Sequence, residues 1–333
     1  MKNGDYASMS GYLRVLEKRL LNSNSIERII DLRDAQETAK AISQSSEYDF
    51  TALEKPEDYE KILSASLKKT YKELYDAAPD KLIMDIILAK YDYHNLKTAI
   101  KSKYLGKNEE HLYIDYTETA PVWITDTVIN ETKHEKLPAN LIEAVSFVSA
   151  AYEQSGNPQS IDVLCDSQMF KYQIGLANAA DNDFVKEYVK FTVDFYNIKA
   201  LLRVKNMNRD LKFLRESLCE GGKIPAAAVV EHYDKNTADL ADIFRKEYFG
   251  GIIGAGIESY DKTGSFSELE RLLDNFLVEY MKKSKFISFG PELLLSYIFS
   301  KENEVRQIRI IMTCKINNIP PSVLRERLRD NYA

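Results

Sequence analysis

The segment D-Y-H-N-L-K-T-A-I-K at residues 92–101 decides the fold, because it occurs again as D-F-Y-N-I-K-A-L-L-R at residues 194–203. Asp, Asn, an aliphatic residue, Lys, a second aliphatic residue and a basic residue coincide in the two copies. A looser copy, K-E-N-E-V-R-Q-I-R-I at residues 301–310, has Lys301 and Glu304 in place of Asp and Asn. Repetition on this scale indicates a chain built from similar units.

The residues around each copy have the periodicity of long amphipathic helices. In residues 59–78, apolar side chains such as Leu63, Leu67 and Leu74 fall on one helical face, and Pro79 then ends the helix. The same pattern predicts helix pairs at residues 59–78 with 80–104, 161–180 with 183–206, and 266–285 with 291–314. The best strand candidate is the short segment at residues 112–116 (LYIDY). The sequence therefore predicts an all-α fold.

A second marker, an aliphatic residue followed by proline, opens a helix-like run at three places: Leu137-Pro138, Ile224-Pro225 and Ile319-Pro320. The spacings between these places are unequal, which indicates connecting loops of variable length. We expect three helical repeats, at residues 1–120, 121–220 and 221–333.

Composition narrows the class of protein. Gly (13) and Pro (9) are scarce in 333 residues, which argues against an all-β fold with many turns. A net charge of −6 is not that of a general nucleic-acid binder. The N-terminus lacks the apolar core of a signal peptide. Apolar runs fall far short of the roughly 18 residues that span a bilayer. The three cysteines are widely separated and odd in number, which argues against a disulfide framework. We therefore expect a cytoplasmic protein.

Positive charge recurs on the motif helices of this acidic chain. Lys97 and Lys101 are four residues apart and share a helical face, and Lys199 and Arg203 repeat that pair. Recurrence favours three basic faces that meet a partner, with a merely solvated face as the alternative. The candidate partner contacts are Lys97, Lys101, Lys199, Arg203, Arg306 and Arg309. For the polar motif residues Asp92, Asn95, Asp194 and Asn197 we favour structural hydrogen bonds between helices of one unit.

Signals for enzymatic chemistry are weak. The glycine-rich stretch at residues 250–256 follows a helical run, whereas a dinucleotide fingerprint follows a strand, so a helix stop or loop is favoured there. Residues 256–263 approach a Walker A motif, but Asp261 replaces the glycine at which backbone approaches phosphate. The four histidines lack metal-ligand spacing. No catalytic residue, cofactor or metal site is predicted.

The order of several motifs resembles one family. They are G-Y-L-R-V-L-E-K-R-L-L at residues 11–21, the D-x-x-N-L-K motif at residues 92–97, its second copy, and Ile319-Pro320. Together they resemble the C subunit of the V-type rotary ATPases of archaea and bacteria, a relative of the eukaryotic V-ATPase d subunit, over essentially the whole chain.

That resemblance implies a fold, a location and partners. It implies three similar helical domains that form a funnel around a pseudo-threefold axis, on the cytoplasmic end of the membrane c-ring. The funnel would receive the tip of the central shaft with its D-type subunit, and the F-type stalk subunit is a further candidate partner. Association with the membrane would be indirect, through the ring, and the protein would carry torque without a cofactor or catalysis of its own. An all-helical repeat scaffold for another protein partner remains the alternative, and a helical metabolic enzyme is a distant third.

Overall fold

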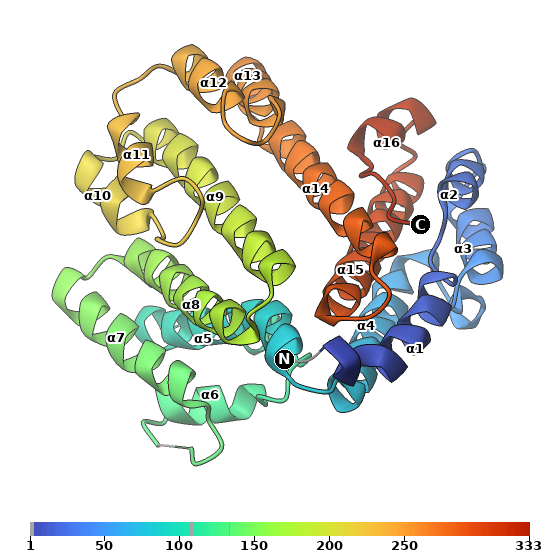
Figure 1. Ribbon diagram of the computed structural model, residues 1–333, viewed down its shortest axis with the longest axis horizontal. Coiled ribbons are helices and arrows are strands. Elements are labelled where there is room, and N and C mark those ends of the chain that lie inside the picture. Colours follow the sequence, from blue (N-terminus) through green and yellow to red (C-terminus); the bar gives the residue numbers. More distant parts are fainter. Residues whose placement is uncertain (1–2, 107–108, 133) are drawn as a thin grey trace. The chain divides into compact units, whose positions relative to one another are not determined.

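The computed structural model describes residues 3–106, 109–132 and 134–333, and its regular elements in these ranges are all helices (Figure 1). The predicted all-α class is confirmed. The chain divides into two compact units: unit 1 comprises Met1–Pro79 with Lys235–Ala333, and unit 2 comprises Asp80–Asp234. Within the described ranges, no helix is both long and apolar enough to cross a bilayer.

Unit 1 is organised around one long central helix. Its elements are η1 (Asn3–Tyr6), α1 (Ala7–Glu17), α2 (Ser23–Ile30), α3 (Ala35–Ser45), η2 (Phe50–Ala52), η3 (Pro56–Asp58), α4 (Tyr59–Ala77), α12 (Thr237–Arg245), α13 (Ile252–Thr263), α14 (Ser267–Lys282), η5 (Lys283–Phe286), α15 (Pro291–Ile316) and α16 (Pro321–Arg327). The central helix is α15, which packs against α1, α3, α4, α14 and α16. It is buried on nearly all sides, including the consecutive residues 293–298, so it lacks the solvated stripe of a surface helix.

The glycine-rich stretch of unit 1 serves close helix packing. Gly250 and Gly251 adopt positive φ angles of 64° and 86° and form the turn before α13. A Cβ added at Gly254 would lie 2.7 Å from the carbonyl oxygen of Ala241, and one at Gly256 would lie 2.5 Å from the side chain of Leu269. The expected loop is thus confined to Gly250 and Gly251, and the remaining glycines let α13 approach α12 and α14.

Unit 2 is a second helical body with its own core. Its elements are α5 (Leu82–Leu105), η4 (Glu110–Leu112), α6 (Pro121–Val128), α7 (Ala139–Ser155), α8 (Pro158–Ala180), α9 (Asp183–Asn206), α10 (Leu211–Ser217) and α11 (Ala226–Glu231). Helix α8 packs against α5, α7 and α9 (Figure 1). Leu96, Ile100, Ile124, Leu141 and Cys165 are fully buried in the main apolar cluster.

The predicted helices agree with α4, α5, α8, α9, α14 and α15 to within about three residues at each end. The best strand candidate, residues 112–116, is not a strand: Leu112 closes η4, and residues 113–116 are irregular. The backbone N–H and C=O of Ile114 bond to the side chain of Asn95, so the segment does not need a neighbouring strand. The repeat boundaries at residues 120 and 220 stay a prediction.

Candidate functional site

The first motif clamps the loop that leads to α6. Asn95 is fully buried on α5; its Nδ2 donates to the Ile114 carbonyl at 2.7 Å, and the Ile114 N–H donates to Asn95 Oδ1 at 2.9 Å. One turn earlier, Asp92 Oδ1 accepts a hydrogen bond of 2.6 Å from the hydroxyl of Thr117. Burial raises the pKa of Asp92 to about 7, although the Thr117 hydrogen bond opposes that rise. The motif thus satisfies loop backbone groups that would otherwise be buried without partners.

The second motif does the same on α9. Asn197 Nδ2 donates to the Cys219 carbonyl at 2.8 Å, and the Cys219 N–H donates back to Asn197 Oδ1 at 2.8 Å. Asp194 accepts from the N–H groups of Lys223 at 2.9 Å and Ile224 at 3.1 Å, just before α11. The four polar motif residues therefore hold loops of their own unit, which corrects the expectation of bonds between helices.

In the third copy, Asn303 makes the hydrogen bond that corresponds to those of Asn95 and Asn197. The sequence alignment had instead matched these two residues with Glu304. Asn303 Nδ2 donates to the Asp330 carbonyl at 3.0 Å, which is the bond that Asn95 and Asn197 make to their loops. Its Oδ1, however, is buried without a partner, because the Asp330 N–H donates to Asn275 Oδ1 at 2.9 Å instead. The third clamp is therefore half complete, and its register differs by one residue from the alignment that matched Glu304 with Asn197.

Lys301 and Glu304, which depart from the motif, form a buried charged cluster in unit 1. Lys301 is 1% exposed, and its Nζ lies 2.8 Å from Glu304 Oε2 and 2.6 Å from Glu47 Oε1. Glu304 also accepts from the Leu21 N–H at 2.6 Å and the Tyr48 hydroxyl at 2.7 Å. Burial opposes ionisation of Glu47, but adjacent Lys301 outweighs it and lowers the Glu47 pKa. The cluster ties α15 to the N-terminal segment.

Lys97 and Lys101, the candidate contacts of the first motif, pair with carboxylates of α8. Lys97 Nζ lies 2.8 Å from Asp166 Oδ1, and Lys101 Nζ lies 2.6 Å from Asp162 Oδ1. Burial disfavours the charge on Lys97, but Asp166 outweighs that effect and raises the Lys97 pKa. Because these side chains are partly exposed, each pair contributes at most about 1 kcal/mol to stability.

Arg306 and Arg309, the candidates of the third copy, are also paired within their unit. Arg309 makes two hydrogen bonds to Glu60 of α4, at 2.8 and 2.5 Å, and Arg306 lies 2.7 Å from Asp274 of α14. On α9, Arg203 is exposed and Lys199 is half-buried. Burial raises the pKa of Asp166, and the nearby charges of Lys97 and Arg203 oppose that rise. The basic residues of the first and third copies therefore join helices within their units, and the role of all six residues as partner contacts stays a prediction.

Sequence reasoning did not find the carboxylates that receive these cations. Glu60 and Asp162 lie 102 residues apart, which is also the separation of Asp92 from Asp194. Each sits near the start of the first helix of its pair, and each receives a cation from a motif helix, Arg309 or Lys101. The shared offset is the signal that could have found them.

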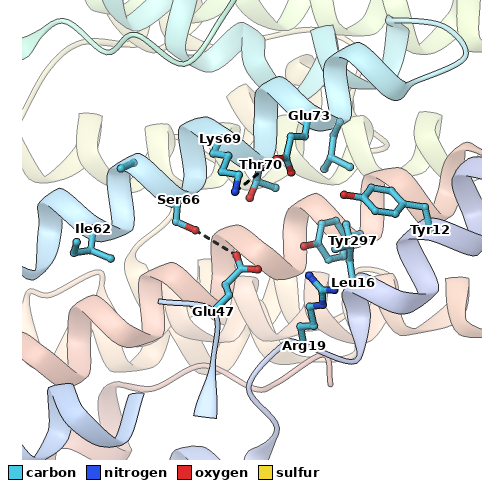
Figure 2. Close-up of a pocket in the computed structure, with 12 residues that line it drawn as sticks. Tyr12, Leu16, Arg19, Glu47, Ile62, Ser66, Lys69, Thr70, Glu73 and Tyr297 are labelled. Atoms are coloured by element: carbon cyan, nitrogen blue, oxygen red, sulfur yellow. Dashed lines mark hydrogen bonds and ion pairs between the residues drawn. The ribbon is translucent and has the colours of Figure 1, made fainter. Parts of the chain in front are cut away.

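A groove of about 560 Å³ lies between α1, α4 and α15 in unit 1 (Figure 2). Residues from all three helices line it, among them Tyr12, Arg19, Ser66, Lys69, Glu73 and Tyr297, together with Glu47. Figure 2 shows Ser66 bonded to Glu47 and Lys69 paired with Glu73, at 3.3 and 3.8 Å. In the described part of the chain, no group of three or more His, Cys, Asp or Glu residues could hold a metal ion. The groove thus presents charges of both signs, and its two carboxylates already have partners.

The fold and these contacts define a class, an all-helical protein in which recurring polar residues of its sequence motif hold its own loops. The family model described as ATP synthase (C/AC39) subunit matches residues 9–327. The chain belongs to this family.

Curated relatives match along most of their length. The C subunit of the V-type sodium ATPase of Enterococcus hirae is 25% identical over 331 residues, which cover 98% of this chain and 99% of the relative. The C subunit of the A-type ATP synthase of Methanocaldococcus jannaschii is 23% identical, over 97% of this chain and 86% of the relative. That of Haloferax volcanii is 26% identical, over 80% of this chain and 79% of the relative. The resemblance inferred from the motifs is confirmed.

Proposed function

We propose that this chain is a non-catalytic rotor subunit that links the central shaft, through its D-type subunit, to the membrane c-ring. It transmits torque between ATP hydrolysis or synthesis and ion translocation, and the F-type stalk subunit is a further partner. The observation that carries the proposal is the family match over residues 9–327, which leaves only short ends of the chain outside it. The protein is held peripherally on the cytoplasmic face of the membrane through the ring.

The internal repeats support three similar domains arranged as a funnel around a pseudo-threefold axis, with repeats at residues 1–120, 121–220 and 221–333. Asn95, Asn197 and Asn303 each donate to a backbone carbonyl of a later loop. Such clamps and the ion pairs between helices suit a body that must resist twisting, because each fixes a loop or a helix pair in one arrangement. On this proposal the six basic residues of the motif helices meet acidic groups of the shaft or ring.

Co-purification tests this function. The tagged full-length chain should retain the D-type subunit and components of the c-ring from membranes of its own cells. A chain with full helicity by circular dichroism that retains neither would contradict the proposal. Turnover of ATP by the purified chain alone would contradict its non-catalytic character.

A further inference from the structure

Residues 283–290 connect α14 to α15 (Figure 1). This loop carries an exposed aromatic side chain, that of Phe286. Phe286 is 93% exposed, the highest value among the large apolar side chains of the described residues, and Phe289 in the same loop is 44% exposed. A single exposed apolar residue is common on protein surfaces. Phe286 differs from such residues in two respects: hydrogen bonds fix the backbone of its loop, and lysines surround it in the sequence.

The backbone of this loop is fixed from α1. Arg14 donates from one guanidinium nitrogen to the carbonyl oxygens of Ser284 at 3.0 Å, Lys285 at 3.3 Å and Ile287 at 2.8 Å. The Gly290 N–H donates to the hydroxyl of Ser10, also on α1, at 3.3 Å. The carbonyls on both sides of Phe286 are therefore anchored, and the ring projects from a fixed backbone.

The C-terminal segment supports the same loop. The hydroxyls of Tyr332 and Ser284 lie 3.1 Å apart, and Lys285 Nζ donates to the Tyr332 carbonyl at 2.5 Å. Ser284 is fully buried, although Phe286 two residues later is almost fully exposed. Exposure of Phe286 is thus a property of an ordered loop and not of a frayed end.

The surroundings of Phe286 are basic. Lys282, Lys283 and Lys285 precede it, and residues 282–290 contain no Asp or Glu. Lys282 is paired with Glu279 at 2.5 Å, whereas exposed Lys283 lies over the ring of Tyr280, with Nζ 5.0 Å from the ring centre. A partner for this surface therefore needs an apolar pocket for the ring and carboxylates around its rim.

We propose that Phe286 is an anchor that inserts into an apolar pocket with an acidic rim on a neighbouring protein subunit of the rotary complex. This rests on the proposed function, because it names how the chain grips one of its partners. An aromatic side chain on a fixed backbone loses only its few side-chain rotations on binding, and aromatic residues of this kind often dominate a protein interface. Attachment to a lipid surface relies instead on a broad apolar face, commonly of an amphipathic helix, and η5 has only four residues.

Replacement of Phe286 tests the anchor, with Phe147 as the matched control. Phe147 is 50% exposed on α7, so Phe147→Ala removes the same side chain from a different surface. We expect Phe286→Ala to lower retention of the partner subunit at least about tenfold in the co-purification assay, and Phe147→Ala to retain it as the wild type does. Both variants should unfold at the temperature of the wild type, since neither ring is buried.

The possible outcomes separate the anchor from the proposed function. Normal retention by Phe286→Ala, with normal retention by the wild type, would overturn the anchor and leave the rotor function standing. A folded wild-type chain that retains no subunit would overturn both. Sedimentation of the wild type with phosphatidylserine vesicles that Phe286→Ala loses, with subunit retention unchanged, would assign the loop to the membrane and overturn the protein partner. A photo-crosslinking amino acid at position 286 should label one subunit in the assembled complex.

Discussion

Asn197 is a fully buried amide whose two polar atoms both bond to the backbone of Cys219. Its importance comes from the groups it satisfies, since both the N–H and the C=O of Cys219 would lose their partner without it. A buried backbone group left unsatisfied costs about 1–3 kcal/mol. The same logic applies to Asn95 and, for one bond only, to Asn303.

Truncation of this amide should therefore destabilise unit 2. We expect Asn197→Ala to lower the free energy of unfolding by about 2–4 kcal/mol, because two buried hydrogen bonds are lost together. The single tryptophan, Trp123, lies on α6 in unit 2, so its fluorescence in a urea titration reports the change. Asn130→Ala is the control: Asn130 is exposed, its side chain bonds to Asp126 and its loss should cost less than about 0.5 kcal/mol. Equal costs for the two variants would refute the role of the clamp.

Asp92 gives unit 2 a dependence on pH. Burial raises its pKa to about 7 from 3.8, so the folded state favours the protonated carboxyl. The stabilisation from protonation is complete below about pH 4 and is lost as the pH rises through 7. We expect the free energy of unfolding of Asp92→Asn, measured by urea titration, to exceed that of the wild type by up to about 4 kcal/mol at pH 8 and to differ little from it at about pH 4. A variant less stable than the wild type at pH 8 would contradict this assignment.

At the scale of helices, the sequence predicted the bounds of the long helices well, but it did not predict which loops and helices the motif residues contact. The six long helices were predictable because their apolar spacing and their flanking prolines are local signals. The clamped loops were not, because Ile114 and Cys219 take part through backbone atoms that any residue possesses. The packing role of Gly254 and Gly256 was also hidden, since it depends on the approach of α12 and α14.

The sequence predicted which residues of the candidate site recur, but not the groups they contact, because those groups lie far away along the chain. The repeat identified the polar residues that act in equivalent ways, but it matched Glu304 with Asn197, whereas Asn303 makes the equivalent bond. Sequence alone also left the basic residues free to face a partner, because a carboxylate on another helix is distant along the chain. Lys101 and Asp162, for example, are separated by 61 positions.

A charge exchange between α5 and α8 separates the structural role of Lys101 from its role in binding. Lys101→Asp alone should destabilise unit 2 by about 1 kcal/mol, because it faces Asp162 with a second carboxylate. Combined with Asp162→Lys, it should regain part of the lost stability, since the ion pair is restored with opposite polarity but Lys97, 3.8 Å from Asp162 in the wild type, then faces a second cation. If Lys101 also contacts a partner, the exchanged variant should retain less of the shaft or the ring, most clearly at low salt. Wild-type retention at every salt concentration would leave Lys101 with the structural role alone.

At the scale of the whole molecule, unit 1 is assembled from both ends of the chain. Residues up to Pro79 and those from Lys235 onward form one compact body. The Lys301 and Glu304 cluster joins them, because it binds Glu47, Tyr48 and the Leu21 backbone from α15. The third copy of the motif thus has, in place of Asp and Asn, a pair of charges that fastens the N-terminal segment.

Removal of the Lys301 ammonium from this cluster should strongly destabilise unit 1. We expect Lys301→Met to lower the free energy of unfolding by about 3–5 kcal/mol, because it leaves Glu304 buried without its cation. Thermal denaturation followed by circular dichroism measures the change. Lys283→Met, which removes an exposed ammonium from the same unit, should shift the midpoint little. Similar midpoints for the two variants would show that the cluster does not hold the segment.

The assembly of unit 1 from two distant stretches of chain also sets an order of events during synthesis. Unit 2 is continuous, so a ribosome has delivered all of it once Asp234 emerges. Residues preceding Pro79 are made first but reach their partners last, because Arg14 must wait for Ile287 and Leu21 for Glu304. The segment up to Pro79 therefore stays incompletely folded until Ile287 and Glu304 have been translated, and in that interval its apolar side chains are open to chaperones and proteases.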